Sequence, residues 1–279
     1  MVINNSPLVT VITPVYNGSQ YLEDLIESVL SQDYPNIEHI IIDDGSIDNG
    51  ATVATLGKHP YLNWWSQENK GQYATMNEGI LAAKGEILCF VNADDVVIPN
   101  AVRSAVQYLQ AHPFLDGVFG STGYIDQNGK DYPYWIPFQF TSLRFYPYFA
   151  HISHCSLYIK KQSIRQYGLF FDPSLRFVGD YEWIIRIYKA GLRIGMLRQQ
   201  LSKVRIHTDQ TSQKNKAESA LEAKTVLKTQ HINHLSYFLL SAINLFLLRI
   251  WKSLRMLKTF GVRGTLTYLA ERMAIQRKY

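Results

Sequence analysis

Hydrophobic residues in the N-terminal part of the chain follow two patterns, short runs and residues spaced three or four positions apart, and these patterns alternate along the chain. Short runs rich in apolar and β-branched residues predict strands at residues 8–13, 38–42, 61–65 and 86–91. Between these runs, apolar residues recur three or four positions apart and predict helices at residues 19–32, 72–83 and 99–111. Strands that alternate with helices are typical of an open, mostly parallel sheet with helices on its faces. The sequence therefore predicts a Rossmann-like α/β fold, with Ser19 as the N-cap of the first helix.

The pattern beyond residue 111 is less regular. Aromatic residues crowd residues 124–149, where they could stack on a sugar but are explained equally well by core packing. A strand is predicted at residues 156–159, and helices are predicted at residues 161–167 and 180–190. No internal repeat is visible.

Two pairs of acids, Asp43-Asp44 and Asp94-Asp95, directly follow two of the predicted strands. Ligands of open α/β sheets bind beyond the carboxyl ends of the strands. Carboxylates that crowd together repel one another unless a cation offsets their charge. Mg²⁺ and Mn²⁺ take oxygen ligands from one or two carboxylates and from substrate phosphates. Each pair alone is explained by an ordinary turn, but both at one edge of a sheet indicate a site for a metal and a diphosphate.

Basic residues gather at the C-terminus. The chain has a net charge of +5, and its segment from residue 228 onward holds nine Lys or Arg against one Glu. The remainder of the chain is therefore net acidic, which argues against a nucleic-acid partner and favours an anionic surface that meets the tail.

Residues 235–248 carry no charge and are too few to span a bilayer. Wound as a helix, residues 235–257 place their basic side chains on one side and most of their apolar side chains on the other, which suits a helix lying in a membrane interface. The alternative is packing on the catalytic domain or on a second subunit, as in a homo-oligomer. No signal peptide is apparent, and the isolated Cys89 and Cys155 fit a reducing compartment. We expect a cytoplasmic protein at the inner face of the cell membrane.

Several segments together resemble the family 2 glycosyltransferases over about residues 8–210. The segments are VITPVYNG at 11–18, IDDGS at 42–46, GQYATMNEG at 71–79, GEI at 85–87 and NADD at 92–95. The resemblance implies a GT-A fold and an inverting transfer from a nucleotide-diphospho-sugar donor to an acceptor hydroxyl, with Mn²⁺ or Mg²⁺. It also suggests a glycan or lipid-linked glycan acceptor, in cell-envelope or exopolysaccharide assembly.

The resemblance also implies roles for single residues. The loop Pro14–Tyr16 and Asp44 would contact the nucleotide base, whereas Asp94 and Asp95 would bind ribose and metal, with Asp95 favoured as the main metal ligand. Asn92 stands where the family carries the first acid of its Asp-x-Asp motif. The residues expected to bind the nucleotide sugar are Pro14, Val15, Tyr16, Asp43, Asp44, Gly71, Asn77, Asn92 and Asp94.

An inverting transfer needs a general base that accepts the proton of the acceptor hydroxyl. The run FVGDYEWIIR at 177–186 resembles the family's base segment, with Asp180 at the position of the base and Gly179 where another acid is usual. Asp180 is also explained as a helix N-cap. Glu182 would point away from Asp180 on a helix, so we prefer Asp180. Candidate contacts to the acceptor, the diphosphate or the metal are His154, Trp183 and His207, although lone histidines are usually structural and Trp183 is readily explained by packing.

The sequence thus predicts a nucleotide-sugar-binding half at residues 1–100, an acceptor-binding half at 101–215 and a basic helical tail at 216–279. One alternative is a catalytically silent nucleotide-sugar binder or scaffold, which Asn92 and Gly179 favour. A nucleotidyltransferase would carry a basic, Gly-rich loop after its first strand, and residues 14–18 hold no basic residue. A dinucleotide-binding dehydrogenase is disfavoured because no Gly-x-Gly-x-x-Gly follows a strand. Donor, acceptor and linkage are not predicted.

Overall fold

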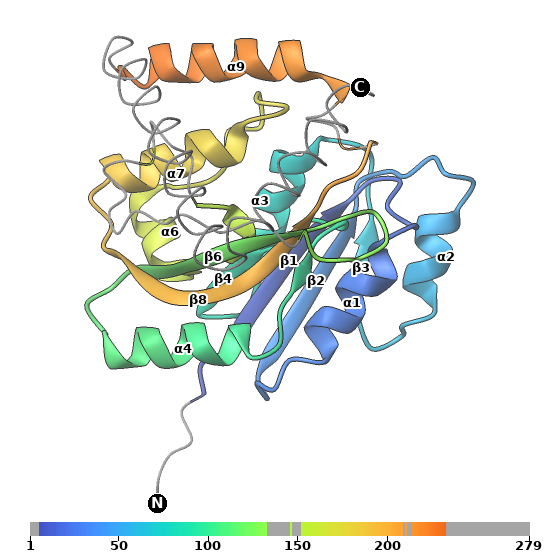
Figure 1. The fold of residues 1–279 in the computed structure, drawn as a ribbon, viewed down its shortest axis with the longest axis horizontal. Helices are drawn as coiled ribbons and strands as arrows, with labels where there is room; N and C mark the ends of the chain where they lie inside the picture. The colour runs from blue at the N-terminus through green and yellow to red at the C-terminus, as the bar shows by residue number, and fades with distance from the viewer. Residues whose placement is uncertain (1–5, 133–145, 147–151, 209, 211–213, 233–279) are drawn as a thin grey trace, which may run out of the picture.

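The computed structural model describes residues 6–132, 146, 152–208, 210 and 214–232 (Figure 1). The predicted amphipathic helix at residues 235–257 and most of the ring-rich stretch lie outside these residues. Within that stretch, Tyr146 is buried and its ring packs 5.6 Å from that of Tyr181. In the described part of the chain, no helix has the length and apolar character needed to cross a membrane.

A single curved sheet forms the centre of the described structure. Its strands lie in the order β3-β2-β1-β4-β7-β6-β8-β5. The first half of this order is parallel and consists of β1 (Val9–Val15), β2 (Ile37–Asp43), β3 (Asn63–Ser66) and β4 (Ile87–Phe90). The other strands are β5 (Val96–Val97), β6 (Gly117–Ile125), β7 (Leu157–Lys160) and β8 (Ile194–Arg205). Because β7 runs antiparallel to both β4 and β6, it joins the two halves of the sheet.

Helices cover both faces of the sheet (Figure 1). One core lies beneath α1 (Leu22–Leu30), α2 (Ala51–Gly57) and α4 (Ala101–Ala111). The other lies beneath α3 (Gln72–Ala82), α6 (Lys161–Tyr167) and α7 (Gly179–Lys189). Side chains of a strand alternate between faces, so Val11 enters the first core and Ile12 the second. Burial on both faces explains why β1, with the sequence VTVITPV, is rich in β-branched residues and carries no charge.

The helix termini differ from the predictions in detail. Tyr21, and not Ser19, is the N-cap of α1, and no side chain caps that helix. Asn100, in a left-handed conformation with φ of 64°, precedes α4, so Pro99 lies just outside the helix. Val178, and not Asp180, is the N-cap of α7. The acid predicted as the base therefore lies inside the first turn of this helix and not at its N-cap position.

A further helix, α9 (Lys216–Thr229), packs on α7. Figure 1 shows it at the upper edge of the molecule, above α7 in this view. Val226 is buried in the same core as α7, and Leu227 is buried beside it in the sequence. Gln230 donates to Glu182 of α7 at 2.9 Å. The first part of the predicted tail is therefore packed against the fold, whereas its residues from 233 onward lie outside the described part of the chain.

Candidate active site

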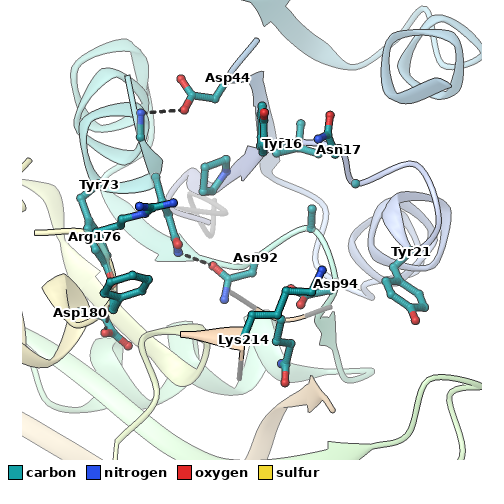
Figure 2. Close-up of a pocket in the computed structure, with 18 of the residues that line it drawn as sticks. Tyr16, Asn17, Tyr21, Asp44, Tyr73, Asn92, Asp94, Arg176, Asp180 and Lys214 are labelled. Carbon is teal, nitrogen blue, oxygen red and sulfur yellow. Dashed lines mark hydrogen bonds between the residues drawn. The ribbon is translucent and has the colours of Figure 1, made fainter. Parts of the chain in front are cut away.

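A pocket of about 810 Å³ opens beyond the carboxyl ends of β1, β2 and β4. Figure 2 shows Asp44, Asp94 and Asp180 at separate places around it. These acids come from the end of β2, the turn after β4 and the first turn of α7. The predicted binding residues that line the pocket are Pro14, Val15, Tyr16, Asp44, Gly71, Asn92 and Asp94. The parallel half of the sheet thus brings together most of the residues named from the sequence.

The Asp44 carboxylate is held rigidly at the pocket wall. Its Oδ1 accepts hydrogen bonds from the Gln67 side chain and the Lys70 backbone, both at 3.0 Å. Its Oδ2 accepts the Gly71 backbone N–H at 2.9 Å. Gly71 has φ of 89°, a conformation that favours glycine and aims this N–H at the acid. Asp44 therefore fixes the loop that leads into α3, and this loop in turn fixes Asp44.

Two residues expected to contact the donor are structural instead. Asp43 is 2% exposed, and its Oδ1 accepts the backbone N–H of Ser46, which closes the turn after β2. Asn77 donates to the Phe171 carbonyl at 2.9 Å and accepts the Phe171 N–H at 2.8 Å. Neither lines the pocket. Their side chains hold backbone segments in place, and this corrects both expectations.

The acidic turn after β4 places its two acids in different surroundings. Asp95 is 1% exposed and accepts the Arg205 backbone N–H, the Asn92 amide and the Cys155 thiol, all within 3.1 Å. Burial, reinforced by the charge of Asp94, raises the pKa of Asp95 to about 7. Asp94 lines the pocket, and its Oδ2 accepts from Nε2 of His207 at 3.0 Å. Asp94 is therefore the acid of this pair that faces the pocket, whereas Asp95, expected as the main metal ligand, is turned into the protein.

A buried arginine, which was not singled out from the sequence, holds this turn. Arg205 is 1% exposed, and its guanidinium donates to the Asp94 carbonyl at 2.9 Å and to the Asp24 carboxylate of α1 at 2.7 Å. It also lies 4.5 Å above the Tyr21 ring centre. Because these partners come from separate segments, Arg205 joins the acidic turn to α1. The sequence carries no signal for this role, since Arg205 meets these partners only in space.

Asp180 faces the pocket from the first turn of α7, with 31% of its side chain exposed. Its Oδ2 lies 3.0 Å from Nδ1 of His154. Its Oδ1 accepts the Tyr181 N–H at 2.8 Å and the Tyr73 hydroxyl at 3.4 Å. Burial raises the pKa of Asp180, but the hydrogen bond and charge of His154 outweigh burial, so the pKa lies below its usual value. Asp180 is therefore ionised near neutral pH and can accept a proton.

His154 links Asp180 to the acidic turn. Its second nitrogen, Nε2, lies 3.2 Å from Oδ1 of Asn92, an oxygen that also accepts the Gln72 amide at 3.0 Å. Burial lowers the pKa of His154, but the contact with Asp180 and the charges of Asp95 and Asp94 outweigh it and raise the pKa. Both ring nitrogens face oxygen acceptors, so the doubly protonated ring satisfies both contacts. Asn92 stands where the resemblance led us to expect an acid. Its side-chain oxygen accepts a hydrogen bond from His154, which also pairs with Asp180.

The residues around Asp180 correct one further expectation. Trp183 is fully buried, its Nε1 donates to the Leu169 carbonyl at 2.7 Å, and its ring stacks on Phe171 at 4.4 Å. It belongs to the core and does not reach an acceptor. Glu182 is 5% exposed and pairs with Arg186 at 2.7 Å, pointing away from the pocket as the helical spacing predicts.

Gly179 is explained by a contact that the sequence does not reveal. A Cβ atom at this position would lie 2.6 Å from Cδ2 and Cε2 of Tyr73. The Tyr73 ring is 3% exposed, stacks 5.8 Å from Phe171 and therefore fills the space that a side chain at position 179 would need. The residue that replaces the family's usual acid is thus matched to a tyrosine whose hydroxyl reaches Asp180.

Comparisons with known proteins agree with this geometry. The model of Glycosyl transferase family 2 matches residues 10–168. An uncharacterized glycosyltransferase of Rickettsia typhi is 33% identical over 215 residues, which cover 74% of this chain and 66% of that protein. A second uncharacterized glycosyltransferase, of Rickettsia felis, is 32% identical over 216 residues, or 75% of this chain and 36% of the relative. The chain thus spans about a third of one relative and almost two thirds of the other.

Among solved structures, residues 1–349 of S. aureus TarS in complex with UDP-GlcNAc superpose with a TM-score of 0.64 at 19% identity. The superposition covers 85% of this chain and 71% of that one. The complex of the same TarS fragment with UDP gives a TM-score of 0.62 at 20% identity, covering 85% of this chain and 70% of that one. This likeness shows that the fold is GT-A. Together with the family match over residues 10–168, it establishes that the chain belongs to glycosyl transferase family 2.

Proposed function

We propose that the protein is an inverting glycosyltransferase that moves a sugar from a nucleotide-diphospho-sugar to an acceptor hydroxyl. One observation carries this proposal: Asp44, Asp94 and Asp180 reach a single pocket from three segments that lie far apart in the sequence. A nucleotide site, a diphosphate site and a base must be arranged in this way around a bound donor. The UDP and UDP-GlcNAc complexes of TarS support a nucleotide-linked donor.

The donor would lie along the carboxyl edge of the parallel strands. The nucleotide base would rest against Pro14–Tyr16 and Asp44, which line one end of the pocket. Asp44 is suited to this task because three hydrogen bonds hold its carboxylate in place before any ligand binds. A preorganised contact of this kind costs little ordering on binding. The diphosphate would then extend toward Asp94.

Asp94 fits a divalent metal. One of its oxygens contacts His207, and the other, Oδ1, has no hydrogen-bond partner among the described residues. Mg²⁺ and Mn²⁺ are commonly bound by one or two carboxylates together with substrate phosphates. We therefore propose that Asp94 would hold the metal, while Asp95 keeps the turn in shape from inside the protein. The metal, when bound, would offset the charge that develops on the leaving diphosphate.

Asp180 would act as the general base. The acceptor oxygen attacks the anomeric carbon of the donor sugar, and its proton passes to the Asp180 carboxylate. The bond between that carbon and the diphosphate oxygen breaks, and its electron pair leaves with the diphosphate. The lowered pKa keeps Asp180 ionised, and the hydrogen bonds from His154 and Tyr181 orient its carboxylate.

The acceptor would enter on the side of the pocket lined by Arg176 and Phe177. A polysaccharide or lipid-linked glycan of the cell envelope is the acceptor class that we propose. We also propose that residues 235–257 rest on an anionic membrane surface, where such an acceptor would be met.

Transfer is tested with a panel of UDP-, GDP- and dTDP-sugars, in the presence of Mn²⁺, Mg²⁺ or EDTA, by measuring nucleotide release. We expect one donor class to be hydrolysed slowly with metal, and this activity to be lost in Asp94→Asn. Asp131→Asn, which alters an exposed acid outside the pocket, serves as the control. Donor binding without any turnover would instead favour a silent binder, and the absence of both would contradict the proposal.

A further inference from the structure

The backbone immediately before α7 is held by an acid from the far end of the described chain. Glu222 of α9 accepts the backbone N–H of Arg176 on Oε1 at 2.8 Å. Its Oε2 accepts the N–H groups of Phe177 at 2.7 Å and of Val178 at 2.8 Å. One carboxylate thus receives hydrogen bonds from three successive residues that lie 44–46 positions away in the sequence.

This arrangement supplies an acceptor for the backbone N–H groups at and just before the start of α7. The first N–H groups of a helix and of the residues before it lack partners within the helix, and a capping side chain usually accepts one of them. The N-cap residue of α7, Val178, has no capping side chain, and the Asp180 carboxylate accepts the first-turn N–H of Tyr181. A negative charge near a helix N-terminus is also stabilised by the helix dipole. Glu222 therefore accepts the N–H of the N-cap residue Val178 and of the two residues before it, from another helix.

The segment that Glu222 holds borders the pocket. Arg176 and Phe177 both line it, and Asp180 lies two residues beyond Val178. A shift of this backbone would move the acceptor side of the pocket and the turn that carries Asp180 together. The contacts of Glu222 and the direct hydrogen bonds to Asp180 therefore both help to set the position of the Asp180 carboxylate.

Helix α9 is anchored well enough to act as a support. Its buried Val226 and Leu227 fix the helix by packing. Beyond its C-terminus, Gln230 donates to Glu182 at 2.9 Å and its carbonyl accepts from Lys189 at 2.6 Å. Both of these partners lie on α7, so α9 is fixed to the same helix at two places. The position of Glu222 relative to Asp180 is thereby determined.

We propose that Glu222 is a positioning residue for sugar transfer. It holds residues 176–178 so that the Asp180 carboxylate and the acceptor hydroxyl are correctly placed relative to each other. This inference rests on the proposed function, since it assigns Asp180 the role of base. It makes α9 a part of the catalytic unit. A merely structural role would predict lower stability with unchanged kinetics of the folded enzyme.

The test compares Glu222→Gln with Glu218→Gln in the full chain. Glutamine keeps the length of the side chain, but its Nε2 would face an N–H donor. Glu218 is exposed one turn earlier on α9, so its substitution removes the same charge without touching residues 176–178. Amide exchange of residues 176–178, followed by mass spectrometry, is expected to speed up about tenfold or more in Glu222→Gln only. Unchanged exchange would overturn the proposal whether or not the protein transfers sugar.

The kinetic arm separates positioning from stability. We expect kcat for transfer to acceptor to fall about ten- to a hundredfold in Glu222→Gln, with the KM for the donor within twofold, because small displacements of reacting groups cost about this much. Glu222→Asp keeps the charge and should recover part of the loss, and it serves as the test if the glutamine variant does not fold. Faster exchange with unchanged kcat would reduce Glu222 to a structural cap and overturn the proposal. A wild type that transfers no sugar would instead refute the function on which the proposal rests.

Discussion

Replacement of Gly179 by alanine should destabilise the protein, although alanine is the better helix former. The added Cβ would lie 2.6 Å from two ring carbons of Tyr73, against an ordinary contact of at least 3.4 Å. The ring would have to move by about 0.8 Å, the difference between these distances, and its packing leaves little room. Overpacking costs about 1–3 kcal/mol, and the helix preference of alanine returns about 0.5–1 kcal/mol. We expect a net loss of about 1 kcal/mol, within the span of about 0–2.5 kcal/mol that these two effects allow.

Gly57→Ala is the matched control. Gly57 ends α2, its backbone does not need a left-handed conformation, and an added Cβ meets no atom within 4 Å. This variant should gain about 0.5–1 kcal/mol. Urea unfolding of both variants at neutral pH is therefore expected to give changes of opposite sign. Should Gly179→Ala be as stable as Gly57→Ala, Tyr73 would not fill the space at position 179, and the account of this glycine would fail.

Three further predictions concern the acidic turn and the core. Asp94→Asn should weaken the Mn²⁺-dependent part of nucleoside diphosphate binding at least about tenfold, as measured by calorimetry, and unchanged binding would exclude Asp94 as the ligand. Arg205→Lys should lower the free energy of unfolding by about 2–3 kcal/mol, because lysine cannot reach the Asp94 carbonyl and the Asp24 carboxylate together. A change below about 0.5 kcal/mol in urea unfolding would argue that Arg205 does not join the acidic turn to α1. Burial lowers the pKa of His39 to about 3, so below pH 6.5 the unfolded chain gains a proton that the folded chain does not, and stability falls as the pH drops. The free energy of unfolding lost through His39 should reach about 2 kcal/mol at pH 5, and this loss should be absent in His39→Gln. Equal losses in the two proteins would contradict the role of His39.

The parallel half of the fold was predictable from the sequence because its strands are buried on both faces. An unbroken apolar run such as residues 87–91 indicates a buried strand when helical patterns flank it. Strand β8 was not predicted, since most of its residues are only partly buried and its sequence, IGMLRQQLSKVR, is largely polar. Strand β6 was missed for a different reason, because it contains three glycines. One of these, Gly120, permits close contact with β8, where an added Cβ would lie 2.4 Å from Leu201.

The candidate site was predictable as a set of segments but less so as a set of side chains. Spacing placed Asp94 and Asp95 on one turn, yet which acid faces outward is determined by Arg205, about a hundred residues away in the sequence. Helical geometry likewise separated Glu182 from Asp180 correctly. It could not tell that the face of α7 carrying Trp183 is turned inward, because that depends on packing against Phe171. Sequence patterns specify periodicity, whereas orientation comes from tertiary contacts.

A crystal structure of the protein with Mn²⁺ and a nucleoside diphosphate would examine the proposed site most directly. We expect one anomalous manganese peak about 2.1 Å from a carboxylate oxygen of Asp94, bonded also to the diphosphate, with the nucleotide base beside Asp44. A nucleotide bound outside this pocket, or manganese held without Asp94, would contradict the arrangement of donor, metal and base proposed for this glycosyltransferase.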